Sequence, residues 1–152
     1  MKRITLLCLL LIAPAAQAGE FDAESYKEGS MNVLIGWSCA SLAAGAAMMT
    51  YGSTFYRAVG IQCLAWGAID LGIAVFAKEE KQMLGLDLGT KKGLYDLFFI
   101  NFLIDIAYMA AGTGLLIWGN EGLKGHGAGI LLQGGFLFAF DGINALLLSG
   151  SF

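Results

Sequence analysis

The sequence predicts an all-α integral membrane protein, a four-helix bundle made of two tandem helical hairpins and preceded by a signal peptide. Hydrophobic residues make up 57% of the 152 residues and charged residues only 14%, which is more apolar than a soluble domain. Four separate apolar stretches each have about the 20 residues that a helix needs to cross a bilayer. A positively charged start followed by a brief apolar run is typical of an export signal.

The signal peptide is expected over residues 1–18. Lys2 and Arg3 form its positive end, residues 4–13 its apolar segment and residues 16–18, Ala-Gln-Ala, its cleavage site. The apolar run is too short for a membrane span, and an uncleaved anchor is the alternative. Removing two of the nine basic residues leaves seven against twelve acidic residues, a net charge of −5. Without clustered Lys and Arg, we expect no nucleic-acid partner.

The remaining chain is expected to form a four-helix transmembrane domain over residues 31–152, after an exported polar lead at 19–30. The turns at 51–56 and 119–127 are short, whereas the link at 78–96 is long and carries more charged residues than any other segment. The four predicted spans are at about 31–50, 57–77, 97–118 and 128–149.

The exported start of the chain sets the predicted orientation. Both mature termini are expected on the outer, periplasmic side of a bacterial inner (cytoplasmic) membrane, with the two short turns in the cytoplasm. The four lysines of the link at 78–96 argue for the reverse by the positive-inside rule. We follow the signal peptide because export of the first segment is decided first.

An internal repeat relates the two hairpins. Gln62 and Asp70 in the second predicted span match Gln133 and Asp141 in the fourth at one constant offset. A two-helix unit that repeats in the same orientation predicts a pseudo-two-fold axis along the membrane normal. Chance similarity between apolar stretches is the alternative, and the paired intramembrane polar residues argue against it.

Three aspartates, Asp70, Asp105 and Asp141, lie inside predicted spans without a basic residue in the same span. Each would cost up to about 2.5–3.5 kcal/mol near the middle of a lipid-facing helix, so we expect all three to face the bundle interior. Their similar distances from the outer ends of their spans predict one polar cluster in the outer half. The other expected members of this cluster are Tyr108, Asn101, Asn144 and Asn32.

The polar residues leave three roles open: hydrogen bonding between helices, cation or proton handling, and a ligand pocket. Gln62 and Gln133 are predicted to pair helices. Small residues of the first span at helical spacing, Gly36, Ala40 and Ala44 and also Ser41 with Gly45, predict a packing face.

Enzyme signatures are absent from the sequence, and we expect no catalytic residue, metal or cofactor. His126 is the only histidine, in the Gly125-His126-Gly127 run of the third link, and one histidine cannot make a His-rich metal site. The expected partners are the lipid bilayer and either a second copy or another membrane protein.

The sequence resembles a family of bacterial four-helix membrane proteins known only as a domain of unknown function. The resemblance lies in residues 105–109, Asp-Ile-Ala-Tyr-Met, in Gly125-His126-Gly127, and in the stretch 133–141, which begins with Gln-Gly-Gly and ends in Asp. The resemblance covers the four spans and is sharpest in the second hairpin. It implies a fold but no catalytic residues. We therefore predict an uncharacterised structural or accessory membrane component that packs through small and polar intramembrane residues. The alternative is a small transporter or an ion- or proton-coupled ligand-binding protein that uses the aspartates.

Overall fold

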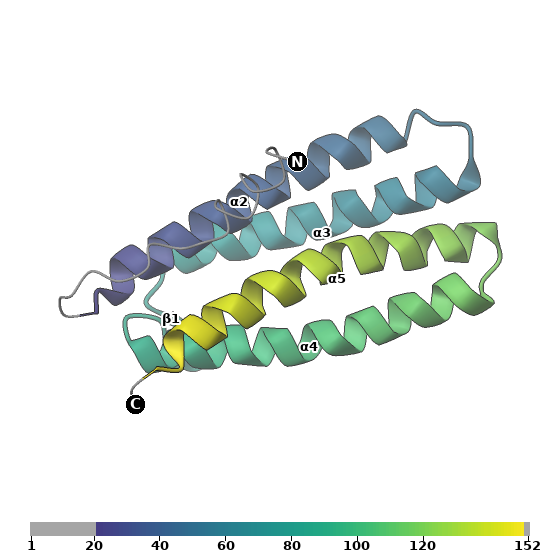
Figure 1. Cartoon of the computed structure of the whole chain (residues 1–152). Helices are drawn as coiled ribbons and strands as arrows, with labels where there is room; N and C mark the ends of the chain where they lie inside the picture. Colours follow the sequence, from purple (N-terminus) through teal and green to yellow (C-terminus); the bar gives the residue numbers. More distant parts are fainter. Residues whose placement is uncertain (1–20, 151–152) are drawn as a thin grey trace, which may run out of the picture.

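The computed structural model of the chain describes residues 21–150 (Figure 1), so the predicted signal peptide at 1–18 lies outside the described residues. Four long helices dominate this part, with two short strands between the second and the third. The elements are α2 (Ala23–Met48), α3 (Thr54–Glu79), β1 (Gln82–Met83), β2 (Leu86–Asp87), α4 (Lys91–Trp118) and α5 (Glu121–Leu148). All four helices are long and apolar enough to cross a membrane. The all-α, four-helix class is therefore confirmed, and membrane insertion stays a prediction.

The helices form two antiparallel hairpins, α2 with α3 and α4 with α5, that pack side by side through α3 and α5 (Figure 1). The turns within the hairpins lie at one end of the bundle, which we call the turn end. The β1–β2 link and the end of α5 lie at the opposite end, which we call the link end. Because α3 and α5 are both the second helix of a hairpin, they run in the same direction, which fits two equivalent hairpins. The internal repeat itself stays a prediction.

All four helices begin before the apolar stretches that predict them. Three of them begin after a side chain that accepts hydrogen bonds from the amides of the first turn. These capping residues are Asp22, Thr90 and Asn120. The polar lead at 19–30 is therefore largely helical, and so is most of the third link at 119–127. His126 lies within α5 rather than in a turn.

Glycines allow the helices to approach each other closely. In the first hairpin, a Cβ atom on Gly45 would lie 2.8 Å from the carbonyl oxygen of Gly60, and one on Gly60 would lie 2.9 Å from that of Gly45. In the second hairpin, a Cβ atom on Gly127 would lie 2.6 Å from the carbonyl oxygen of Gly112. Each hairpin is thus held by a glycine pair at which the two backbones touch, as small residues permit in membrane helices.

A β-hairpin that the sequence analysis does not predict closes the link between the two helical hairpins. Gln82 pairs with Asp87 and Met83 with Leu86. The tip at 84–85 is left-handed, with φ of 54° at Leu84 and 80° at Gly85, as a tight two-residue turn requires.

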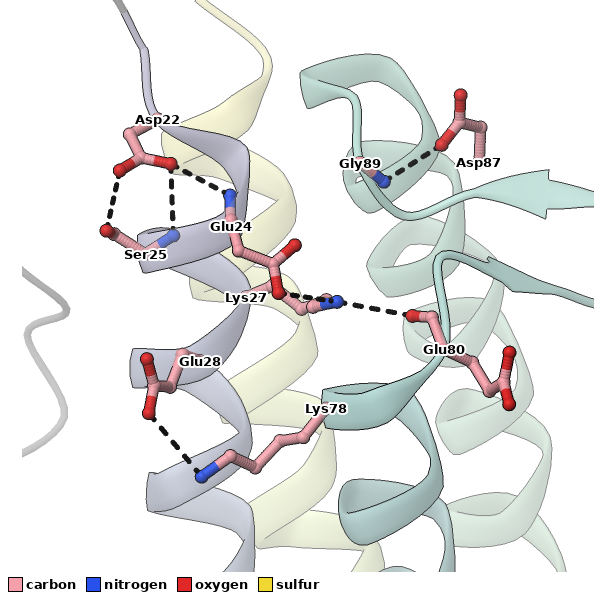
Figure 2. A network of polar contacts seen from close by, with 9 residues as sticks. All are labelled: Asp22, Glu24, Ser25, Lys27, Glu28, Lys78, Glu80, Asp87 and Gly89. Atoms are coloured by element: carbon pink, nitrogen blue, oxygen red, sulfur yellow. Dashed lines mark hydrogen bonds and ion pairs between the residues drawn. The ribbon is translucent and has the colours of Figure 1, made fainter.

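Charged side chains close the link end of the first hairpin (Figure 2). Lys27 is buried and reaches from α2 to the end of α3, where its ammonium donates to the carbonyl oxygen of Glu80 at 3.2 Å; it also pairs with Glu24 at 3.1 Å. Lys78 pairs in turn with Glu28 at 3.7 Å. The buried apolar core lies next to this end, where Leu88, Leu94 and Phe98 are buried together with residues of all four helices.

Candidate functional site

Asp70, Asp105 and Asp141 come together inside the bundle, from α3, α4 and α5. Their exposed fractions are only 3%, 4% and 4%. The three carboxyl groups are close enough to interact electrostatically, Asp141 with both Asp105 and Asp70, and Asp70 also with Asp105. We call these three residues the carboxyl trio. All three aspartates are therefore buried in the bundle, where an ionisable side chain avoids lipid.

The carboxyl trio has no basic partner among the described residues, whose ion pairs all lie at the link end. One carboxyl oxygen of Asp70 and one of Asp105, Oδ2 in each, are buried without a hydrogen-bond partner. The described Asp, Glu, His and Cys side chains form no group that could hold a metal ion.

Tyr108 and Asn101 lie on the same helix as Asp105 but outside the carboxyl trio. The Tyr108 ring meets the edge of the Trp66 ring, with 4.8 Å between their centroids and an interplanar angle of 83°. Tyr108 is 39% exposed, so it joins α4 to α3 at the periphery of the bundle. Asn101 is half-buried, and none of the described hydrogen bonds involves its side chain.

Asn32 and Asn144 differ from their predicted place in the polar cluster. Asn32 is exposed, and its side-chain oxygen accepts a hydrogen bond from the Lys78 ammonium at 2.8 Å, so it belongs to the charged link end. Asn144 is buried, but its side-chain oxygen accepts from the hydroxyls of Tyr26 at 2.8 Å and Ser30 at 3.1 Å. Tyr26 and Ser30 lie in the segment 19–30, which the sequence predicts as a polar lead outside the bundle. Their contact with Asn144 is therefore not predicted.

Gln133 lies between α2 and α5 and is 1% exposed. Its side-chain oxygen accepts from the Trp37 indole at 2.9 Å and from the Ser41 hydroxyl at 3.3 Å, and its amide nitrogen lies 3.2 Å from the same hydroxyl. Gln62 similarly joins α3 to α5, with 2.9 Å between its amide nitrogen and Nδ1 of His126. Both glutamines therefore lie where two helices meet.

Trp37 is the partner of Gln133 that sequence reasoning misses. Trp37 and Ser41 are four residues apart, so they share a face of α2, and that spacing is the signal that could have found them. The expected packing face of the first span divides in two. Ser41 and Gly45 are buried, whereas the stripe of Gly36, Ala40 and Ala44 is exposed on the outside of α2.

The chain is a candidate multi-pass helical membrane protein. It has four helices that could each cross a membrane, polar side chains paired across the helix interfaces, and the carboxyl trio inside. A family model matches residues 33–142, so the chain belongs to this family, which is described as Family of unknown function (DUF6992). The match extends from the first helix to the third aspartate of the carboxyl trio. A search of curated proteins and a search of solved structures each found no match.

Proposed function

We propose that this chain is a structural or accessory component of a bacterial inner membrane, with both mature termini on the periplasmic side and without enzymatic activity. Its partners in this proposal are the bilayer and either a second copy or another membrane protein, not nucleic acid. The observation that carries the proposal is that amide side chains within the bundle are hydrogen-bonded to side chains of neighbouring helices. Gln133 and Asn144 each bridge α5 to α2, and Gln62 bridges α3 to α5.

The grooves on the described residues also support this proposal. One is formed by α4 and α5 and the other by α2 and α3, and neither is lined by a member of the carboxyl trio. A transporter needs a path from water to its binding groups, and polar side chains that hold helices together do not. Two grooves that are not lined by the carboxyl trio therefore favour a structural role.

A second candidate function, proton binding coupled to another process, is favoured by the carboxyl trio itself. Neutral amides already provide the hydrogen bonds between helices, and an amide at Asp105 would provide one as well. What a carboxyl group adds in lipid is the ability to take up and release a proton, at a cost that membrane proteins usually accept for function. The buried, unpartnered oxygens of Asp70 and Asp105 are the observation behind this candidate.

One experiment separates the two candidates. The full chain is placed in lipid vesicles that contain a pH-sensitive dye, and proton entry is followed after a pH step. The structural role predicts the same proton entry as protein-free vesicles, both for the parent chain and for Asp105→Asn. Proton entry that Asp105→Asn abolishes and Asp87→Asn retains would overturn the structural role in favour of proton handling. Asp87 is a matched control because it is exposed in the β1–β2 link.

A further inference from the structure

Two cations lie at the turn end of the bundle, one from each hairpin. Arg57 is the fourth residue of α3 and Lys124 is the fourth residue of α5, and both side chains are exposed. The beginnings of these two parallel helices are in contact, since a Cβ atom on Gly125 would lie 2.4 Å from the carbonyl oxygen of Phe55. Arg57 and Lys124 are therefore at a similar level along the bundle.

Both cations are available to a partner outside the chain. Within residues 21–150, neither the Arg57 side chain nor the Lys124 side chain takes part in a hydrogen bond or an ion pair. The acid at this end, Glu121, accepts a hydrogen bond from the Ser53 hydroxyl at 3.2 Å. Residues 49–57 and 118–127 carry two cations against one acid, so the turn end is positive.

The link end has the opposite charge. Residues 22–28 and 78–96 carry five lysines against seven acids. Lys81 is exposed and follows two glutamates in the chain. The other four ammonium groups of these segments already have partners, and they belong to Lys27, Lys78, Lys91 and Lys92. The four lysines of the long link therefore do not make the link end the positive end of the bundle.

Exposed aromatic rings surround the two free cations. Trp118 ends α4 and is 83% exposed, and Tyr51 and Tyr56 are exposed beside the other turn with 5.5 Å between their ring centroids. Tyrosine and tryptophan gather at the membrane–water interface, because their rings are apolar and their edges carry a hydrogen-bonding group. These rings therefore indicate that the turn end lies at the level of lipid headgroups.

We infer that the turn end binds the anionic phospholipid headgroups of one leaflet through Arg57 and Lys124. Cations in the first turn oppose the helix dipole, so helix stability does not account for them. Lysine and arginine near a membrane surface attract anionic lipids, and these two have no competing partner in residues 21–150. The inference rests on the membrane placement proposed above, in which this leaflet is the cytoplasmic one, and holds for either candidate function.

Spin-label electron paramagnetic resonance on the full chain in vesicles tests this inference. Phosphatidylcholine vesicles that contain the chain receive a trace of spin-labelled phosphatidylglycerol or spin-labelled phosphatidylcholine with identical acyl chains. We expect the chain to restrict the motion of phosphatidylglycerol more strongly. Arg57→Gln combined with Lys124→Gln should lower this preference about five-fold, the effect of one cation at a membrane surface. Arg57→Lys keeps the charge and should retain the preference.

The matched control is Lys81→Gln combined with Lys92→Gln, which removes the same charge from two exposed side chains of the link end. It should leave the preference unchanged. Equal preference in the parent chain and the turn-end variant would overturn the inference, and so would equal losses in the two double variants. A chain that does not float with the vesicles after a high-salt wash overturns the proposed membrane placement instead, before any lipid preference is measured.

Discussion

Replacing Gln133 with leucine removes the polar contact between α2 and α5 while keeping the side chain similar in volume. The substitution takes hydrogen-bond acceptors from the Trp37 indole and the Ser41 hydroxyl, and Ser41 is only 4% exposed. Hydrogen bonds between membrane helices contribute about 0.6 kcal/mol on average and up to about 1.7 kcal/mol. Ser41 can turn to a carbonyl oxygen of its own helix, but the indole has no such alternative. We expect a loss of roughly 1–3 kcal/mol in the free energy of unfolding.

The matched control is Asn101→Leu. It also replaces an amide by a leucine side chain within a helix, but Asn101 takes part in none of the side-chain hydrogen bonds described for residues 21–150. Unfolding is followed by titration with sodium dodecyl sulfate in mixed micelles, using helical circular dichroism. Gln133→Leu should unfold at a lower detergent fraction than the parent chain, and Asn101→Leu should not.

A double-mutant cycle with Trp37→Phe isolates the indole contact. If Gln133 and Trp37 are coupled as the 2.9 Å distance indicates, the two changes together should cost less than the sum of each alone. Equal losses in Gln133→Leu and Asn101→Leu, or strict additivity in the cycle, would refute the reasoning that this amide holds α2 to α5.

Two further perturbations act at the link end. Gly93→Ala should lower the free energy of unfolding by about 1–3 kcal/mol, because its methyl group would meet the backbone of Asp87. Gly36→Ala is the control: its methyl group meets nothing within 4 Å, so it should not destabilise the chain in the same denaturation assay. Hydrogen bonds from the Ser25 hydroxyl and amide hold the pKa of Asp22 below its ordinary value of 3.8. This cap is therefore complete above that pH and is lost as the pH falls through the lowered pKa. The protection of first-turn amides of α2 against hydrogen exchange, relative to their intrinsic rate at each pH, should fall on acidification in the parent chain but not in Asp22→Asn, which keeps a capping oxygen without a titrating group.

The position of the carboxyl trio could be predicted because one large energy decides it. An unpaired carboxyl group facing lipid is so costly that each aspartate must turn inward, and similar depths then bring the three together. Asn32 and Asn144 could not be placed this way. Amide side chains cost less, so their positions are decided by which donor is within reach, and Lys78 and Tyr26 come from segments expected to be link and lead.

Hydropathy predicts the apolar middle of each helix but not the residue at which the helix begins. Apolar stretches locate the membrane-crossing part of each helix, but a helix begins where a side chain can cap it, as Asp22 and Asn120 do. The glycines of α5 also show that local sequence does not decide where a helix begins. Gly125 and Gly127 indicate a turn when the sequence is considered alone, yet in the bundle the missing side chains let α5 touch α3 and α4, and tertiary packing outweighs local propensity.

The division of the carboxyl trio between the two hairpins has a consequence for biogenesis. Asp105 and Asp141 belong to one hairpin and become neighbours as soon as that hairpin forms, whereas Asp70 belongs to the hairpin made first. In the membrane topology proposed above, Asp70 therefore enters the bilayer before Asp105 and Asp141. Arrival of the second hairpin replaces lipid around Asp70 with polar groups. That relief favours docking of α5 against α3 over separate diffusion of the two halves.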